Sequence, residues 1–446
     1  MTLLREFDQK NLAEVGASLH AFATELYPVC RSITGDGIRR TLAMIGERIR
    51  LHIVETPTGT PVFDWTVPKE WNIRGAYIQG PAGNRIVDFQ DHNLHVLNYS
   101  APVDGTVPLS ELKTHLHTLP ERPGWIPYRT SYYQENWGFC MAHSEAEALE
   151  EGDYRVCIDS TLENGSLTYG ECYLPGQFPD EVLISCHACH PSLANDNLSG
   201  LGVATFLAQY LSGRDLRYSY RFLFIPGTIG AITWLARNRD AASRVRHGLV
   251  LTCIGDSGGF HYKKSRQGVA EIDRAVAHVL RHQNETHEIL EFSPYGYDER
   301  QYCSPGFDLP VGCLMRSVWG TFPEYHTSGD NLDFIRPNAL AGSLRVCTAV
   351  VDLLEGNRSY KNLQPYCEPQ LGRRNLYRST GGDTIATEIN ARLWVLNFSD
   401  GEHSLLDIAE RSGLPFSAIL DAANVLVENQ LLAPMAFAEA KVLQQS

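Results

Sequence analysis

The sequence has no apolar run long enough to span a membrane, and its first residues lack the apolar block of a secretory signal peptide. It also lacks an excess of basic residues, because 38 Lys and Arg stand against 52 Asp and Glu and give a formal net charge of −14. An acidic chain repels the phosphates of nucleic acid. We therefore expect a cytoplasmic protein that neither enters a membrane nor binds nucleic acid.

Disulfide-like cysteine spacing is absent as well, and the eleven cysteines are an odd number. Most of them lie within apolar, strand-like runs, which indicates reduced thiols in the core of an intracellular protein. One pair, Cys186 and Cys189, flanks two histidines, so a Cys/His metal cage is an alternative for that segment. The chain of 446 residues is 43% hydrophobic, which is enough for two or three domains with full-sized cores.

The largest part of the chain, residues 1–54 and 166–375, is typical of an α/β core. Candidate strands lie at 181–187, 220–226, 248–254 and 310–315. Candidate helices lie near 200–212, 229–239, 268–283 and 336–355. Strands that alternate with helices in this way predict a mostly parallel sheet with helices on both faces.

Two other regions differ from this core in amino-acid composition and in the pattern of their apolar residues. Residues 55–165 contain short alternating runs, Pro/Gly turns and many aromatics, which indicates an inserted mostly-β domain. Residues 356–383 have the composition of a linker, and 384–446 contain three short helices typical of a winged-helix-like domain. The third of these helices, within 415–429, has no Lys or Arg, so we expect this domain to contact protein rather than DNA.

The polar loop between the strand 181–187 and the following helix holds His187, His190 and Asp196. Sites in α/β proteins lie in such loops, at the carboxyl ends of parallel strands. Two imidazoles and one carboxylate suit a divalent metal of the zinc type. The alternative is an ordinary turn with surface histidines and an Asp that caps the helix.

A second polar loop, residues 319–334, contains Glu324, Tyr325 and His326. A third loop follows the candidate strand 248–254 and contains Asp256. If the strands are parallel, these loops open on the same edge of the sheet, so their histidines and carboxylates converge. Neutral imidazoles together with a carboxylate form a hydrolytic zinc site, in which the ion lowers the pKa of bound water.

The motifs CHPSLANDNLSG and YHTSGDN resemble those of the zinc aminopeptidase family, which includes secreted bacterial aminopeptidases and glutaminyl cyclases. Nearly the whole chain, including LYPVCRSITGDGIRRTL, PVFDWTVPKEWNI and SPGFDLPVG, is similar to an uncharacterised aminopeptidase-like family of bacteria. Members of that family combine an aminopeptidase-type core with an inserted β domain and a C-terminal winged helix. Their genes often lie beside surface-polysaccharide or secondary-metabolite genes.

The resemblance implies that Asp196 and His326 are metal ligands, and that His187 or His190, with a slight preference for His190, supplies another imidazole. It also shows one departure from the family pattern. Aminopeptidases carry a Glu pair after the second strand, one Glu as general base and the other as a ligand, whereas this chain has Gly227 in place of the base. We therefore expect one zinc ion rather than two, with Asp256 as a candidate further ligand.

Other residues are candidates for the remaining roles. Glu299 or Glu324 would take over proton transfer. Substrate contacts are assigned to Arg31, Arg300, Arg316 and Tyr325. Arg300 and Arg316 would bind a substrate carboxylate or phosphate, with a structural ion pair as the alternative. For Arg31 the alternative is an ordinary connection between two helices.

Three functions stay open at this point. The first is metal-dependent hydrolysis of an amide bond in a small amino-acyl or peptide-like compound. The second is a biosynthetic enzyme that transfers or cyclises an acyl group, because Gly227 removes the usual means of activating water. The third is a non-catalytic metal-binding scaffold. A homo-oligomer is compatible with all three.

Overall fold

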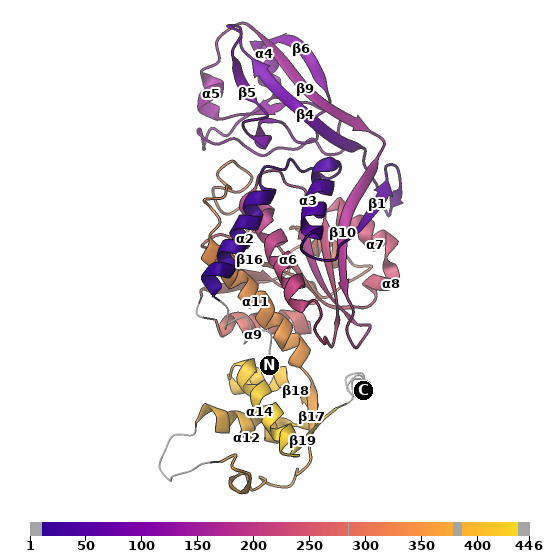
Figure 1. The fold of residues 1–446 in the computed structure, drawn as a ribbon, viewed down its shortest axis with the longest axis vertical. Helices are drawn as coiled ribbons and strands as arrows, with labels where there is room; N and C mark the ends of the chain where they lie inside the picture. Colours follow the sequence, from indigo (N-terminus) through magenta and orange to yellow (C-terminus); the bar gives the residue numbers. More distant parts are fainter. Residues whose placement is uncertain (1–10, 284, 378–385, 436–446) are drawn as a thin grey trace. The chain divides into compact units, whose positions relative to one another are not determined.

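The computed structural model describes residues 11–283, 285–377 and 386–435 (Figure 1). The chain divides into two compact units. The larger unit comprises residues 11–273 and 286–345, and the smaller unit is built from residues 274–283, 285, 346–377 and 386–435. Residues 1–10 of the predicted core, and 384–385 and 436–446 of the predicted winged-helix-like domain, lie outside the described residues.

An eight-stranded sheet forms the core of the larger unit, in the order β1-β10-β12-β11-β13-β16-β14-β15. Its strands are β1 His52–Pro57, β10 Ser166–Leu174, β11 Glu181–His187, β12 Ser219–Ile225, β13 Val245–Leu251, β14 Phe260–Lys263, β15 His287–Leu290 and β16 Val311–Met315. The central strands β12, β11, β13 and β16 run parallel, whereas β1–β10, β10–β12 and β14–β16 pair antiparallel. The predicted α/β class is confirmed, with antiparallel additions at both sides of the parallel centre.

The helices of the larger unit are α2 Leu12–Leu26, α3 Asp36–Gly46, α6 Gly200–Leu211, α7 Ile229–Arg237, α8 Arg239–Ala242 and α10 Glu299–Tyr302. Two longer helices, α9 Glu271–Arg281 and α11 Pro337–Gly356, contribute to both units. All seven residues of β11 are buried, because both faces of this strand are covered. On one face Cys186 contacts the backbone of Gly200 in α6, and on the other Ser185 Oγ lies 2.9 Å from the hydroxyl of Tyr302 in α10.

The inserted β module carries a four-stranded antiparallel sheet in the order β5-β4-β9-β6. These strands are β4 Glu70–Gln79, β5 Arg85–Asp88, β6 Val103–Pro108 and β9 Asp153–Glu163. Its shorter elements are β2 Pro61–Val62, β3 Trp65–Thr66, β7 Leu116–His117, β8 Phe139–Cys140, α4 Leu109–Leu112 and α5 His143–Glu147. Strand β9 is followed directly by β10, which enters the main sheet (Figure 1). The module therefore belongs to the same compact unit as the core.

The smaller unit contains the winged helix. It consists of β17 Ser359–Asn362, α12 Thr387–Phe398, β18 Asp400–Ser404, α13 Leu405–Ser412, α14 Phe416–Glu428 and β19 Leu432–Pro434. Strand β17 lies between β18 and β19 in the sheet and buries Tyr360. The segment 356–383, which the sequence predicts as a linker, therefore contains the start of the winged helix. Its residues Ser359–Asn362 form β17, which pairs with β18 on one side and with β19 on the other.

No helix among the described residues is both long enough and apolar enough to cross a lipid bilayer.

Candidate metal centre

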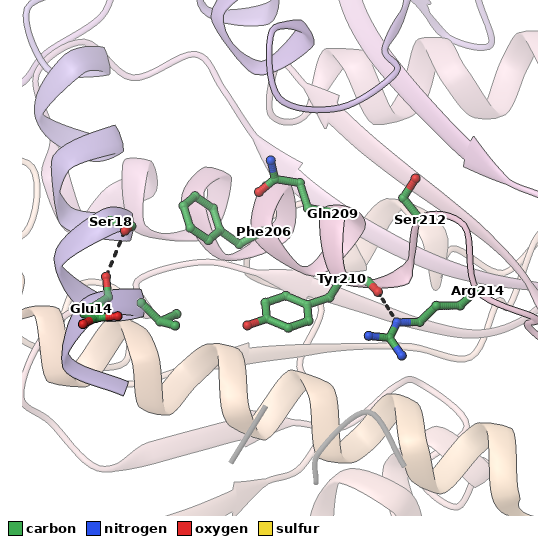
Figure 2. Close-up of a pocket in the computed structure, with 8 residues that line it drawn as sticks. Glu14, Ser18, Phe206, Gln209, Tyr210, Ser212 and Arg214 are labelled. Carbon is green, nitrogen blue, oxygen red and sulfur yellow. Dashed lines mark hydrogen bonds between the residues drawn. The ribbon is translucent and has the colours of Figure 1, made fainter. Parts of the chain in front are cut away.

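A surface pocket of about 550 Å³ lies between α2 and α6 (Figure 2). Its charged side chains are Glu14 and Arg214, and the Nε of Arg214 donates to the backbone carbonyl of Tyr210. No histidine lines this pocket. It therefore lacks the ligands of a zinc site, and the candidate chemistry lies at the carboxyl edge of the sheet instead.

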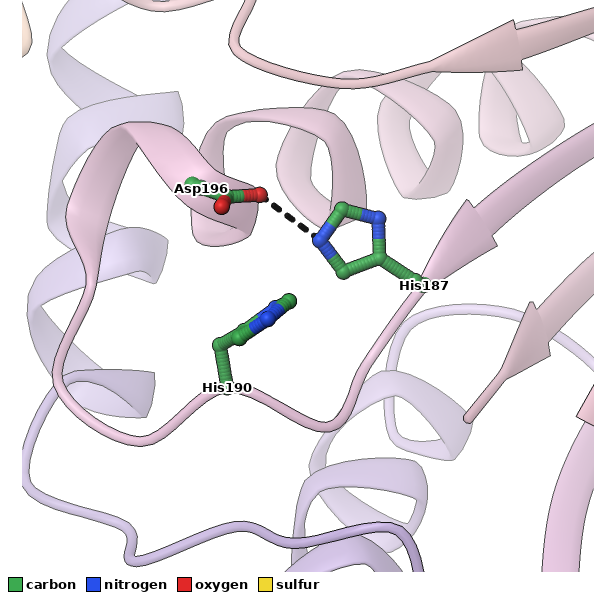
Figure 3. A group of neighbouring side chains, drawn as sticks. All are labelled: His187, His190 and Asp196. Atoms are coloured by element: carbon green, nitrogen blue, oxygen red, sulfur yellow. Dashed lines mark hydrogen bonds and ion pairs between the residues drawn. The ribbon is translucent and has the colours of Figure 1, made fainter. Parts of the chain in front are cut away.

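His187, His190 and Asp196 form the group that the loop motif predicts (Figure 3). One possible ligand atom from each of the three residues lies within 4.8 Å of the other two. His187 is the last residue of β11, and its Nε2 lies 2.7 Å from Asp196 Oδ1. Both of these side chains are fully buried, whereas His190 is partly exposed. The alternatives that the sequence leaves open, His187 or His190, thus both lie beside the same carboxylate.

His326 completes the cluster from a distant part of the chain. Its Nε2 lies 3.0 Å from Asp196 Oδ2, and its ring centroid is 5.2 Å from that of His190. The two histidines come from loops that follow β11 and β16, whose carboxyl ends share one edge of the parallel sheet. The predicted convergence of these loops is confirmed by these distances.

Burial keeps the imidazole of His190 neutral, because it lowers the pKa of this residue well below its ordinary value. The Nδ1 of His190 is buried and has no hydrogen-bond partner among the described residues. Burial opposes ionisation of Asp196, but His190, His187 and His326 together outweigh it and hold the pKa of Asp196 well below its usual range. The neutral imidazole of His190 beside an ionised carboxylate, with one ring nitrogen unsatisfied, fits a divalent cation of the zinc type.

The loop that carries Asp196 is fixed by a second carboxylate. Asp330 is fully buried, and its two oxygens accept hydrogen bonds from the backbone N–H groups of Asn195 at 2.6 Å and Asp196 at 3.0 Å. Asp330 comes from the same loop as His326, so one segment both supplies an imidazole and holds the opposing loop in place. This is a positioning role that the residue type alone does not reveal.

Two tyrosines extend the cluster. Tyr297 donates its hydroxyl to Asp196 Oδ2 at 2.6 Å, and its ring stacks on His187 with centroids 4.4 Å apart. The hydroxyl of Tyr325, which was predicted to contact substrate, lies 2.8 Å from that of Tyr297, and its ring stacks on His326. Burial raises the pKa of both phenols, so both stay neutral. Tyr297 was not predicted from the sequence, although it lies two residues before the candidate Glu299.

The inserted module reaches this centre through Tyr128. The Tyr128 ring meets the rings of His190 and His326 edge-on, with centroids 5.0 and 5.1 Å away. Its backbone N–H donates to the carbonyl of His326 at 2.8 Å. The inserted module thus contributes an aromatic side chain that contacts two of the clustered histidines.

Gly227 lies beside the cluster, two residues after the end of β12 at Ile225. A Cβ at this position would meet the Cβ of His187 at 3.0 Å and Oδ1 of Asp298 at 3.5 Å. Asp298 is fully buried, and neither carboxylate oxygen has a hydrogen-bond partner among the described residues. Burial raises the pKa of Asp298 to about 7, while the charges of His187 and Arg300 act in the opposite direction.

Glu299 does not fill the catalytic role that the sequence predicts for it. It is fully buried, and its Oε1 lies 2.5 Å from the ammonium of Lys263. Lys263 also donates to the carbonyls of Ser293 and Tyr295. Glu299 is therefore committed to a structural ion pair. The other candidate, Glu324, is partly exposed two residues before His326, and its proton-transfer role stays a prediction.

Two of the predicted substrate-binding arginines are also occupied inside the fold. Arg31 is fully buried, with its Nε donating to the carbonyl of His190 at 2.8 Å and one terminal nitrogen donating to that of Leu26. Arg316 is buried as well and donates to the carbonyl of Gly258 at 2.8 Å. Both guanidinium groups donate to backbone carbonyls, because the long arginine side chains turn towards the interior of the fold. Arg300 is partly exposed and lies near Asp298.

Asp256 is not brought into the metal cluster. Its carboxylate accepts hydrogen bonds from Asn195 Nδ2 at 2.8 Å, from the backbone of Gly258 at 2.6 Å and from Ser317 Oγ at 2.7 Å. These bonds tie three loops together at the sheet edge. The prediction that Asp256 replaces a missing ligand is therefore not supported by the geometry.

The fold around this centre is shared with zinc aminopeptidases. The solved structure of a zinc aminopeptidase from Bacillus subtilis is similar with a TM-score of 0.55 at 14% identity, covering 77% of this chain and 95% of that one. This likeness concerns the fold. The class of the larger unit is thus an aminopeptidase-like α/β fold, as the sequence motifs indicate.

The chain belongs to the family described as "Domain of unknown function (DUF4910)", which matches residues 20–357, and a winged helix-turn-helix family matches residues 358–434. A protein of Clostridium acetobutylicum, provisionally named for polysaccharide biosynthesis with an aminopeptidase-like domain, is 50% identical over 424 residues, covering 95% of this chain and 98% of its own. A crystal structure from the same organism, described provisionally as a peptidase, has a TM-score of 0.92 at 48% identity, covering 97% of this chain and all of that one.

Proposed function

We propose that the protein is a metal-dependent hydrolase of the aminopeptidase type that acts on an amide bond in a small amino-acyl or peptide-like compound. The observation that carries this proposal is the grouping of His187, His190 and Asp196 within 4.8 Å, with His326 3.0 Å from Asp196. One zinc ion would be held by these residues. When bound, such an ion polarises a carbonyl and lowers the pKa of a bound water molecule.

The remaining residues prepare the site for this chemistry. Tyr297 orients Asp196 through its hydroxyl and covers His187 with its ring. Tyr128 and Tyr325 pack against the histidines, so they exclude bulk water from that side and define where a substrate lies. Arg31 fixes the carbonyl of His190 and thereby the position of its ring.

Metal analysis together with one histidine variant tests the proposal. Purified protein should contain close to one zinc per chain and hydrolyse aminoacyl p-nitroanilides or aminoacyl amides. His326→Ala should lose metal and hydrolysis together, because it removes an imidazole from the cluster. His52→Ala, which changes an exposed histidine on β1, should retain both. A wild-type protein that holds zinc but cleaves nothing in this panel would contradict hydrolysis.

A second candidate function is transfer or cyclisation of an acyl group in a biosynthetic pathway. Gly227 favours it, because no side chain at this position can activate water, and the Clostridium acetobutylicum relative is named for polysaccharide biosynthesis. In this case the protein would form product from an amino-acyl donor and an amine or sugar acceptor, with little free acid. Mass spectrometry of the products with and without acceptor separates the two functions.

We further propose that the protein is cytoplasmic and that its winged helix contacts protein rather than nucleic acid. Helix α14 has no basic residue, and a DNA-reading helix needs such residues to meet phosphates. Electrophoretic mobility shifts with duplex DNA at low salt should show no complex at micromolar protein.

A further inference from the structure

Asp298 occupies the N-cap position of α10 but does not cap the helix. An aspartate at this position normally accepts a hydrogen bond from the first turn. Here the side chain makes no such bond, is fully buried, and leaves both oxygens without a partner among the described residues. Burying an unpaired carboxylate costs free energy, so this arrangement opposes stability. Such a group is retained where it has a task to perform.

The carboxylate points to the place that a side chain at position 227 would fill. Oδ1 of Asp298 lies 3.5 Å from the position of a Gly227 Cβ, and the Cβ of His187 lies 3.0 Å from it. Gly227 and Thr228 are partly exposed, whereas Asp298 is buried. The glycine does not adopt the left-handed conformation that excludes other residues. Glycine at this position therefore leaves Oδ1 of Asp298 without a side-chain neighbour from position 227, next to His187.

We propose that Asp298 is the general base of this site and takes the place of the glutamate that position 227 lacks. This rests on the proposed hydrolytic function. Asp298 accepts one proton from the attacking water while the water oxygen bonds to the amide carbon. It then returns this proton to the amide nitrogen as the C–N bond breaks, so the products are a carboxylic acid and an amine, and Asp298 is ionised again.

The electrostatic setting of Asp298 agrees with this role. A general base is most effective when its pKa lies close to the working pH. Burial raises the pKa of Asp298 to about 7, with His187 and Arg300 limiting the rise. Glu299, the neighbouring carboxylate, is unsuitable because Lys263 holds it.

Asp298→Asn tests the proposal, because asparagine preserves the shape of the side chain but cannot accept the proton. We expect kcat on an aminoacyl p-nitroanilide to fall by about 10²–10⁴-fold, the usual effect of removing a positioned base. The acidic limb of the pH–kcat profile should disappear. Zinc content should be unchanged, and the metal-free variant should unfold at the same or a higher temperature than metal-free wild type, because an unpaired buried charge is removed. Asp308→Asn, at a half-exposed aspartate paired with Arg266, is the matched control.

Asp298→Ala provides an independent measurement. The smaller side chain leaves room for formate, and added formate should restore part of the lost activity in this variant but not in wild type or His326→Ala. Restoration supports proton transfer at this position.

The other outcomes separate the two proposals. If wild type hydrolyses the panel and Asp298→Asn retains kcat within about threefold, far less than the loss of a base produces, Asp298 is not the base while the hydrolase proposal stands. Loss of zinc, or a lower unfolding temperature of the metal-free variant, would assign Asp298 a structural role and overturn the inference. If wild type cleaves nothing, the hydrolase proposal fails and the role of Asp298 fails with it.

Discussion

At the scale of single residues, the candidate centre depends on groups that hold the ligands as much as on the ligands. Asp196 receives its backbone support from Asp330 and its side-chain support from Tyr297. Outer partners of this kind fix the direction in which a carboxylate offers its lone pairs. The geometry of the cluster is therefore set by hydrogen bonds from loops that are distant in sequence.

Tyr297→Phe isolates one of these supports. The substitution removes the hydrogen bond to Asp196 but preserves the ring that stacks on His187, so zinc affinity should fall by about 10–100-fold. Competition with a chromophoric chelator measures this change. Tyr295→Phe, at a tyrosine that is 72% exposed, should leave the affinity unchanged. Equal affinities in the two variants would show that the hydroxyl does not orient the ligand.

The sequence allowed the grouping of His187, His190 and Asp196 with His326 to be predicted, because strand ends in a parallel sheet meet at one edge and the motif residues lie at those ends. It did not allow the base candidate to be predicted. Glu299 and Asp298 are neighbours, and the turn of a four-residue helix decides which one faces Gly227. The burial of Arg31 could not be predicted from the sequence either. Its loop is polar, and nothing in the loop's composition indicates that the arginine turns inward and donates to a backbone carbonyl.

At the scale of elements, the parallel centre of the sheet was predictable from its apolar strands, and its antiparallel flanks were not. Strand β10 pairs with β1 and β12, and it follows β9 of the inserted module after only two residues, so its place in the main sheet depends on that module. Strand β17 was missed because its residues, Ser359–Asn362, are polar and few. Such short strands are specified by their neighbours more than by their own propensity.

The contact between α3 and β4 carries a pH-dependent prediction. Arg39 donates two hydrogen bonds of 2.7 Å to the carboxylate of Glu70, and this pairing is the main cause that lowers the pKa of Glu70 to about 2. A depressed carboxylate pKa adds stability above the unfolded value near 4.5, and this stability is lost as the pH falls towards 2. Glu70→Gln should thus lower stability at pH 7 by about 1 kcal/mol after allowance for solvent screening.

Thermal melts at pH 7 and pH 2.5 measure this effect, and the difference between wild type and Glu70→Gln should shrink at the lower pH. Glu25→Gln is the control, because Glu25 pairs with Arg48 at 3.2 Å and is 52% exposed. A destabilisation of Glu70→Gln that is the same at both pH values would rule out the ion pair as its cause.

At the scale of the whole molecule, the candidate metal centre lies entirely within the larger unit, since His187, His190 and Asp196 belong to its segment 11–273 and His326 to its segment 286–345. A bound ion stabilises only the state that binds it, by about 2.7 kcal/mol when the free ion is at 100 times its Kd. Removal of metal by a chelator should therefore lower the unfolding temperature of the larger unit. Hydrogen exchange should rise in β11 more than in α13.

Calorimetry with and without chelator checks this prediction, with His326→Ala as the reference that should no longer respond. An unfolding temperature that is identical in both conditions would show that the native chain holds no stabilising ion.

The contact of Tyr128 with His190 and His326 has a consequence for how this architecture diversifies. Since the inserted β module supplies part of the wall around the cluster, substrate selectivity is adjustable by exchanging loops of this module while the α/β core stays intact. Chimaeras that swap residues near Tyr128 between homologues should inherit the preference of the donor.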